Sequence, residues 1–171
     1  MNVKRVAILA LLTAMALIIH VVETLIPLPI PVPGVKLGLA NVVTLFMLFA
    51  EHGRFLGKKF TTAEIIAVLL CRILLGALLA GSPMVLIYSI SGGVFAIAAQ
   101  VLVKRFVTVK QIWVCGAFGA VFHNVGQILA AVIITATPAI AAYLPLLIIA
   151  GLVSGVLTGI ITGLTVTRLK G

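Results

Sequence analysis

Six runs of apolar residues follow one another along this chain, each close to the length that crosses a membrane. A helix of about 20 residues rises about 30 Å, which matches the hydrocarbon core of a bilayer. Soluble domains carry about a quarter charged residues, whereas this chain has 9% charged residues, 63% hydrophobic residues and a mean hydropathy of +1.38. The sequence therefore predicts an all-α integral membrane protein, a single-domain bundle of six spanning helices at about 6–26, 37–56, 62–81, 84–103, 112–135 and 144–166.

The basic residues predict how this bundle is oriented. If the six spans alternate in direction, most of the Lys and Arg residues fall on one side: Lys4, Arg5, Arg54, Lys58, Lys59, Lys104, Arg105, Lys110, Arg168 and Lys170. The positive-inside rule then predicts cytoplasmic termini, an external loop over 27–36 and a multi-pass protein of the inner (cytoplasmic) membrane. Because the net charge of +9 is dispersed over loop ends, where lipid headgroups meet it, it does not indicate a nucleic-acid partner.

Most of the prolines fall in one external segment, 27–33, just before Lys36 and Asn41. Each proline removes a backbone donor and pushes the preceding residue toward an extended conformation, so a helix cannot continue through the segment. We expect residues 27–34 to form a stiff lid over a polar pocket. Lys36 at its mouth would attract anionic groups, or would serve as an interfacial anchor.

Arg72 lies near the middle of the third predicted span. A charge at that depth costs at least about 2.5 to 3.5 kcal/mol, so it must face protein, water or a ligand. The sequence leaves two interpretations open: a ligand-binding or gating residue, and a structural pair with groups on neighbouring helices.

Further polar side chains sit inside the apolar spans. His123, Asn124 and Gln127 lie within two turns, in a groove made by glycines, and are costly unless they are satisfied. They predict ligand contact or an internal hydrogen-bond network. His20 and Glu23 are one turn apart at the external end of the first span, and they form either a wall of the pocket or an interfacial pair. In the fourth span, Tyr88 flanks a stripe of small and polar residues and is a further possible pocket residue.

Two spans carry small residues four positions apart, a spacing that lets helix backbones approach closely in lipid. In the first span these are Ala10 and Ala14, which predict contact with another membrane protein or with another helix of the bundle. In the sixth span Gly151, Gly155, Gly159 and Gly163 predict a packed helix face.

Several catalytic patterns are missing from the sequence. It has no GxxxxGK[ST] phosphate loop, no aspartate for an aspartate-rich diphosphate and Mg²⁺ motif, and no zinc-type spacing of His and Cys. We therefore expect no catalytic residues, no metal and no cofactor, and binding or transport rather than an enzyme.

Two motifs carry a family resemblance. Residues 31–44, which read PVPGVKLGLANVVT, together with HNVGQ at 123–127, resemble the bacterial membrane family labelled Gx transporter or heptaprenyl diphosphate synthase component I. That family is similar to the S components of energy-coupling factor (ECF) transporters. The resemblance implies six helices, a first external loop that caps the site, and an alanine motif, here Ala10 and Ala14, that contacts a transmembrane coupling subunit.

We therefore expect an S-component-like subunit that captures a small molecule in a pocket lined by Lys36, Asn41, Arg72, His123, Asn124 and Gln127. A separate ATPase pair would supply energy through the coupling subunit. The resemblance also implies an alternative, a membrane subunit that binds a quinone or prenyl lipid in quinone metabolism or extracytosolic electron transfer. An apolar tail cavity running to the bilayer, with one or two histidines at its head, would favour that alternative.

Overall fold

The computed structural model describes residues 2–26, 36–50 and 59–170, and this part of the chain contains helices and no strands. The spanning helices begin and end close to the predicted positions. In chain order the elements are α1 (Val3–Glu23), α2 (Asn41–Phe49), α3 (Thr62–Ala80), α4 (Pro83–Lys104), the 3-10 turn η1 (Val109–Gln111), α5 (Ile112–Thr135), the 3-10 turn η2 (Pro138–Tyr143) and α6 (Leu144–Lys170).

Five of these helices are long and apolar enough to cross a membrane, which confirms a multi-pass, all-helical membrane protein. The expected count of six spans is not confirmed. Helix α2 has nine residues, so it covers only about 14 Å at 1.5 Å per residue. The second apolar run, predicted as a span over 37–56, therefore contains a short helix in the described residues, and its part at 51–56 lies outside them.

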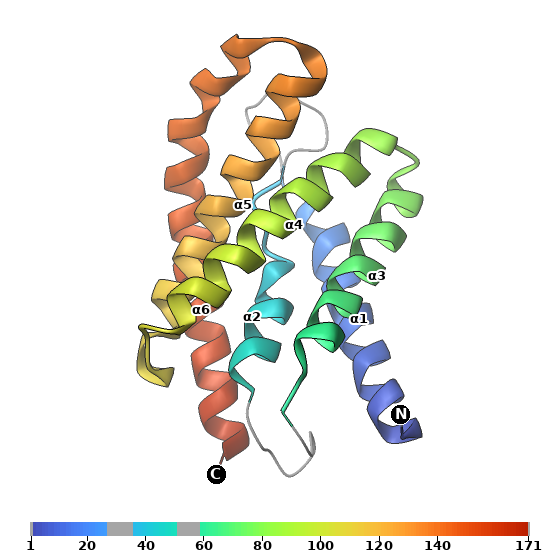
Figure 1. Ribbon diagram of the computed structural model, residues 1–171, viewed down its shortest axis with the longest axis vertical. Helices are drawn as coiled ribbons and strands as arrows, with labels where there is room; N and C mark the ends of the chain where they lie inside the picture. Colours follow the sequence, from blue (N-terminus) through green and yellow to red (C-terminus); the bar gives the residue numbers. More distant parts are fainter. Residues whose placement is uncertain (1, 27–35, 51–58, 171) are drawn as a thin grey trace.

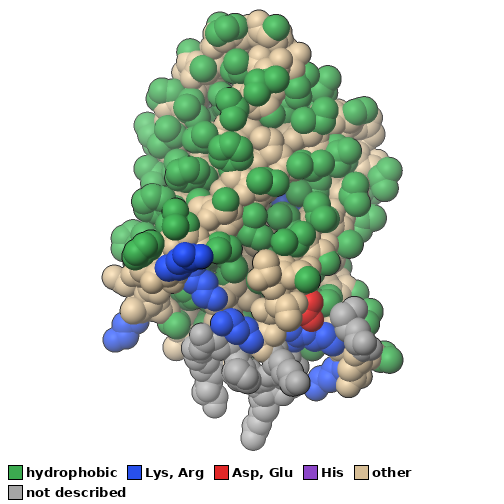
Figure 2. All heavy atoms as spheres, in the orientation of Figure 1, with side chains coloured by type: hydrophobic (Ala, Val, Ile, Leu, Met, Phe, Trp, Pro, Cys, Tyr) green, Lys and Arg blue, Asp and Glu red, His purple; other side chains and the backbone are tan. Residues whose placement is uncertain are grey.

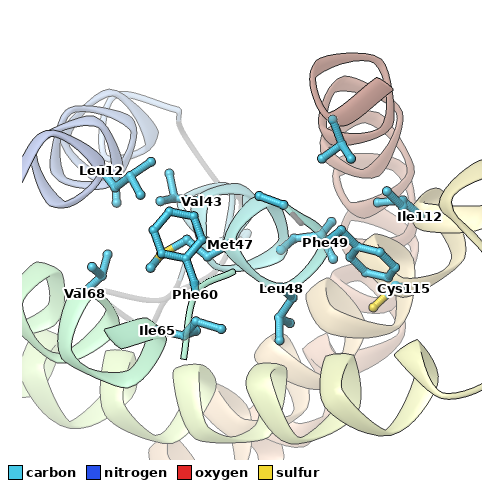
Figure 3. Packing of buried hydrophobic residues seen from close by; sticks show 14 residues of the cluster. Leu12, Val43, Met47, Leu48, Phe49, Phe60, Ile65, Val68, Ile112 and Cys115 are labelled. Atoms are coloured by element: carbon cyan, nitrogen blue, oxygen red, sulfur yellow. The ribbon is translucent and has the colours of Figure 1, made fainter. Parts of the chain in front are cut away.

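Helix α2 is short because it lies at the centre of the bundle. It contacts every other α-helix, and the neighbours pack in the order α1, α3, α4, α5 and α6 around it (Figure 1). Figure 3 shows Val43 and Met47 of α2 pointing toward α1 and α3, and Phe49 pointing toward α5. Protein covers most of α2, and its partly exposed residues Val42 and Phe46 line a groove between α1 and α6, so α2 does not need the length of a span.

Local signals set the helix ends. Thr61 and Glu64 form a capping box at the start of α3, and Gly81 ends it in a left-handed conformation (φ +59°) that glycine adopts without strain. Pro83 begins α4 at the first turn, where a missing N–H costs nothing.

The glycine face of α6 packs against α5, as its four-residue spacing predicts. A Cβ built on Gly155 would lie 2.6 Å from Ala117 Cα, and one on Gly116 would lie 3.0 Å from Gly159 Cα. The backbones of the two helices therefore touch, which only glycine permits at these positions.

The surface of the bundle divides into an apolar body and a basic end. Figure 2 shows hydrophobic side chains over most of one face and Lys and Arg side chains gathered at its lower end. The start of α1 and the end of α6 lie at that same end in Figure 1. The orientation prediction assumes that basic residues and both termini gather at one end of the bundle, and this placement agrees with it. That this end faces the cytoplasm stays a prediction.

Candidate functional site

Three charged side chains meet inside the bundle, away from the basic end. They are Glu23 at the end of α1, Lys36 before α2 and Arg72 in the middle of α3, and their exposed fractions are 4%, 7% and 3%. In α1 the buried residues Leu12, Ala16, His20 and Glu23 form one stripe at helical spacing. The face of α1 that packs on the bundle is therefore apolar at Leu12 and Ala16 and polar at His20 and Glu23, which point into the interior.

Glu23 holds the segment that leads into α2. Its Oε1 accepts hydrogen bonds from the backbone N–H of Gly38 and from that of Leu39, the latter at 3.1 Å. Both N–H groups lie in the turn just before Ala40, the N-cap of α2, and hydrogen bonds from backbone N–H groups to a carboxylate are strong because the acceptor is charged. Glu23 thereby fixes where Lys36 and Asn41 enter the site.

His20 lies between the two cations. Its Nε2 is 2.9 Å from Lys36 Nζ and its Nδ1 is 3.4 Å from Arg72 Nη1. Gly76 of α3 leaves room for the imidazole, since a Cβ there would lie 2.7 Å from His20 Nε2. Burial is the main reason why the pKa of Lys36 lies below its ordinary value. The negative charge of Glu23 raises this pKa, and the positive charge of Arg72 lowers it.

His123 and Gln127 of α5 complete the cluster from the other side. Gln127 Oε1 accepts a hydrogen bond of 3.0 Å from the backbone N–H of Lys36. The His123 ring fits between two glycines. A Cβ built on Gly38 would lie 2.7 Å from Cδ2 of the ring, and a Cβ built on Gly92 would lie 2.7 Å from its Nδ1. Gly38 also has φ +82°, a conformation that L-residues rarely adopt.

The structure therefore brings together most of the residues singled out from the sequence. We call this set the polar cluster: His20, Glu23, Lys36, Asn41, Arg72, His123 and Gln127. A Cβ built on Gly38 would lie 2.7 Å from the His123 ring and 3.0 Å from Asn41 Nδ2. Asn41 and His123 therefore lie on the same side of Gly38, and Asn41 belongs to the cluster.

Two predicted pocket residues lie elsewhere. Asn124 faces α6, where its Nδ2 donates a hydrogen bond of 2.7 Å to the backbone carbonyl of Leu147. Tyr88 packs in an apolar cluster with Ile128 and Leu147. Asn124 thus fits the internal hydrogen-bond network that the sequence left open, and the predicted lid, 27–34, lies outside the described residues.

Sequence reasoning missed the glycines that shape the cluster. Gly38, Gly76 and Gly92 each leave space for an imidazole ring, and the backbone N–H groups of Gly38 and Leu39 bind Glu23. A glycine preceding Asn41 and a glycine pair at Gly92 are visible in the sequence, but which ring each receives depends on the packing of separate helices.

A separate apolar groove of about 380 Å³ runs between α1 and α6, with α2 as its floor. Ile19 and Val42 line one part of it, next in sequence to His20 and Asn41 of the polar cluster. Among the described residues that line it, Thr162 and Thr165 of α6 are the polar side chains, and none is a histidine.

In the described part of the chain, five helices long and apolar enough to cross a membrane surround a buried charged cluster, which makes this a multi-pass membrane protein with a polar site in its interior. The chain matches the family model described as heptaprenyl diphosphate synthase component I over residues 12–165, and it belongs to that family. No curated protein and no solved structure matches it.

Proposed function

We propose that this chain is the substrate-binding membrane subunit of an ECF-type uptake transporter, similar to an S component, and that it is not itself an enzyme. The observation that carries the proposal is the polar cluster, in which four separate segments of the chain place buried polar groups at one point. Buried polar and ionisable groups inside a membrane protein are costly and typically mark a ligand or ion site.

The surface of α1 supports a docking role for the alanine motif. Ala10 and Ala14 are exposed, so they do not take part in packing within the described bundle. A helix face with small exposed side chains lets a second membrane helix approach closely. The proposed occupant is the transmembrane coupling subunit, which an ATPase pair would drive.

Retention of a small molecule tests the binding role. The protein, purified gently from the cells that make it, is examined by native mass spectrometry, together with His123→Ala. We expect a stoichiometric, water-soluble small molecule on the wild-type protein that is depleted in the variant. Equal retention in both proteins would contradict a ligand site at the polar cluster.

Co-purification tests the coupling partner. Ala10→Leu and Ala14→Leu enlarge the exposed α1 face, and Ala98→Leu makes the same change at an exposed position on α4. We expect both α1 variants to lose the associated membrane subunit and its ATPases, while Ala98→Leu keeps them. Retention by all three variants would contradict docking at α1.

The apolar groove favours a second candidate function, binding of a quinone or prenyl lipid. The family description names a prenyl diphosphate synthase component, and the groove offers apolar walls beside exposed residues of α1 and α6. Val42→Phe would fill the groove. A prenyl lipid found on the wild-type protein, kept by His123→Ala and lost from Val42→Phe, would favour this candidate over the first.

A further inference from the structure

The polar cluster contains one more positive than negative charge. Lys36 and Arg72 contribute two cations and Glu23 one anion, while the whole chain has only three acidic residues. Of the other two, Glu64 forms an ion pair of 2.7 Å with Arg5, and Glu51 lies outside the described residues. Within the described part of the chain, no second carboxylate is available to balance the cluster.

Glu23 does not form a close ion pair with either cation. Its Oε1 is engaged by the backbone N–H groups of Gly38 and Leu39. Among the described residues, the ion pair within 4 Å is that of Arg5 with Glu64, at the start of α3. Lys36 and Arg72 therefore feel the charge of Glu23 only at longer range.

His20 cannot satisfy both cations. A neutral imidazole has one nitrogen that accepts and one that donates, and a protonated imidazole has none that accepts. Lys36 Nζ lies 2.9 Å from Nε2 of His20, and Arg72 Nη1 lies 3.4 Å from Nδ1. As long as Lys36 is protonated, His20 can therefore accept a hydrogen bond from only one of these two cations.

Two further donors of the cluster have no acceptor in the described part of the chain. They are Arg72 Nη2 and Asn41 Nδ2, on side chains that are 3% and 5% exposed. An unpaired buried donor costs free energy, and an unpaired buried charge costs more. The cluster thus combines an excess positive charge with unpaired donors, so it lacks oxygen acceptors.

We infer that the polar cluster binds an organic or inorganic anion through a carboxylate or phosphate group, with Arg72 as its main partner. This inference rests on the proposed function, because it names the class of molecule that the same site would take. Carboxylate and phosphate oxygens match the planar fork of a guanidinium and accept two hydrogen bonds at once. Lys36 and Asn41 would supply the further donors.

Thermal unfolding in detergent tests this inference with simple probes. The wild-type protein is heated at constant ionic strength with inorganic phosphate, with benzoate, and with benzamide as the neutral analogue of benzoate. We expect phosphate or benzoate to raise Tm by at least about 2 °C, because a ligand that binds the folded state stabilises it. The arm that responds distinguishes phosphate from carboxylate chemistry.

Two variants assign the effect to the cluster. Arg72→Gln removes the unpaired charged donor, and Arg105→Gln removes an exposed arginine at the end of α4. We expect the anion-induced shift to disappear in Arg72→Gln and to persist in Arg105→Gln. An equal shift with benzamide, a full shift in Arg72→Gln, or no shift with either anion would overturn the inference.

Native mass spectrometry distinguishes failure of the anion inference from failure of the proposed binding function. A neutral or cationic molecule that is retained by the wild-type protein and lost in His123→Ala would overturn the anion inference and leave the binding role intact. An anion that is lost in both His123→Ala and Arg72→Gln would support both.

Discussion

Neutralising Glu23 and neutralising Arg72 should affect stability very differently. Glu23→Gln keeps a side-chain oxygen for the backbone N–H groups of Gly38 and Leu39 but leaves Lys36 and Arg72 as two buried cations. Glu23 contacts neither cation, but it is the opposite charge buried with them in the described part of the chain, and leaving a buried charge uncompensated costs about 3–5 kcal/mol. Arg72→Gln instead leaves one charge of each sign, so we expect a change within about 1 kcal/mol.

Heating the protein in detergent while following the fluorescence of Trp113, the single tryptophan, measures this difference. At about 2–4 °C per kcal/mol for a chain of this size, Glu23→Gln should lower Tm by roughly 6–20 °C and Arg72→Gln by no more than about 4 °C. Arg105→Gln serves as the control for a lost surface charge.

The double variant Glu23→Gln/Arg72→Gln decides between charge excess and a simple structural pair. It restores the single excess positive charge of the wild-type cluster, so it should be more stable than Glu23→Gln alone. If Arg72→Gln were as destabilising as Glu23→Gln and the double variant no worse than either, the two residues would form a structural pair, and the reasoning about an unpaired cation would be wrong.

Four further variants test the packing around the site and between helices. Gly92→Ala places a Cβ against the His123 ring and should cost about 1–3 kcal/mol, whereas Gly163→Ala meets only a carbonyl at 4.0 Å and should stabilise α6 by about 0.5–1 kcal/mol; equal Tm shifts would contradict the observed packing. Gly155→Leu should separate α6 from α5 and lower Tm by roughly 4 °C or more, and an unchanged Tm would refute the backbone contact. Arg5→Gln removes the partly exposed ion pair with Glu64 and should cost about 1 kcal/mol or less in chemical unfolding; a loss of several kcal/mol would mean that the pair is a main tie between α1 and α3.

The spanning helices could be predicted because their signal is local. Runs of apolar residues placed the ends of the five long helices within a few residues of those observed. The second run was interpreted as a span because hydropathy measures how apolar a segment is, without showing what surrounds it. Helix α2 is apolar because five other helices cover it, so its nine residues need not cross the bilayer.

The polar cluster was predicted in its membership more than in its geometry. Arg72, His123 and Gln127 were singled out because polar groups are costly in an apolar span. Asn124, the neighbour of His123 in sequence, points about 100° away around α5 and binds the carbonyl of Leu147 instead. That direction depends on where α6 packs, which the spacing within α5 does not reveal.

The sequence by itself determined that this chain is a helical membrane protein, where its five long apolar helices lie and which buried groups are expensive, because hydropathy and backbone propensity act over a few turns. The tertiary structure alone decided which of those groups meet. The contact of Lys36 with Gln127 joins residues 91 positions apart, and that of Arg72 with His20 joins residues 52 apart. Such contacts form only when whole helices pack, so the charge excess of the cluster emerges from the fold.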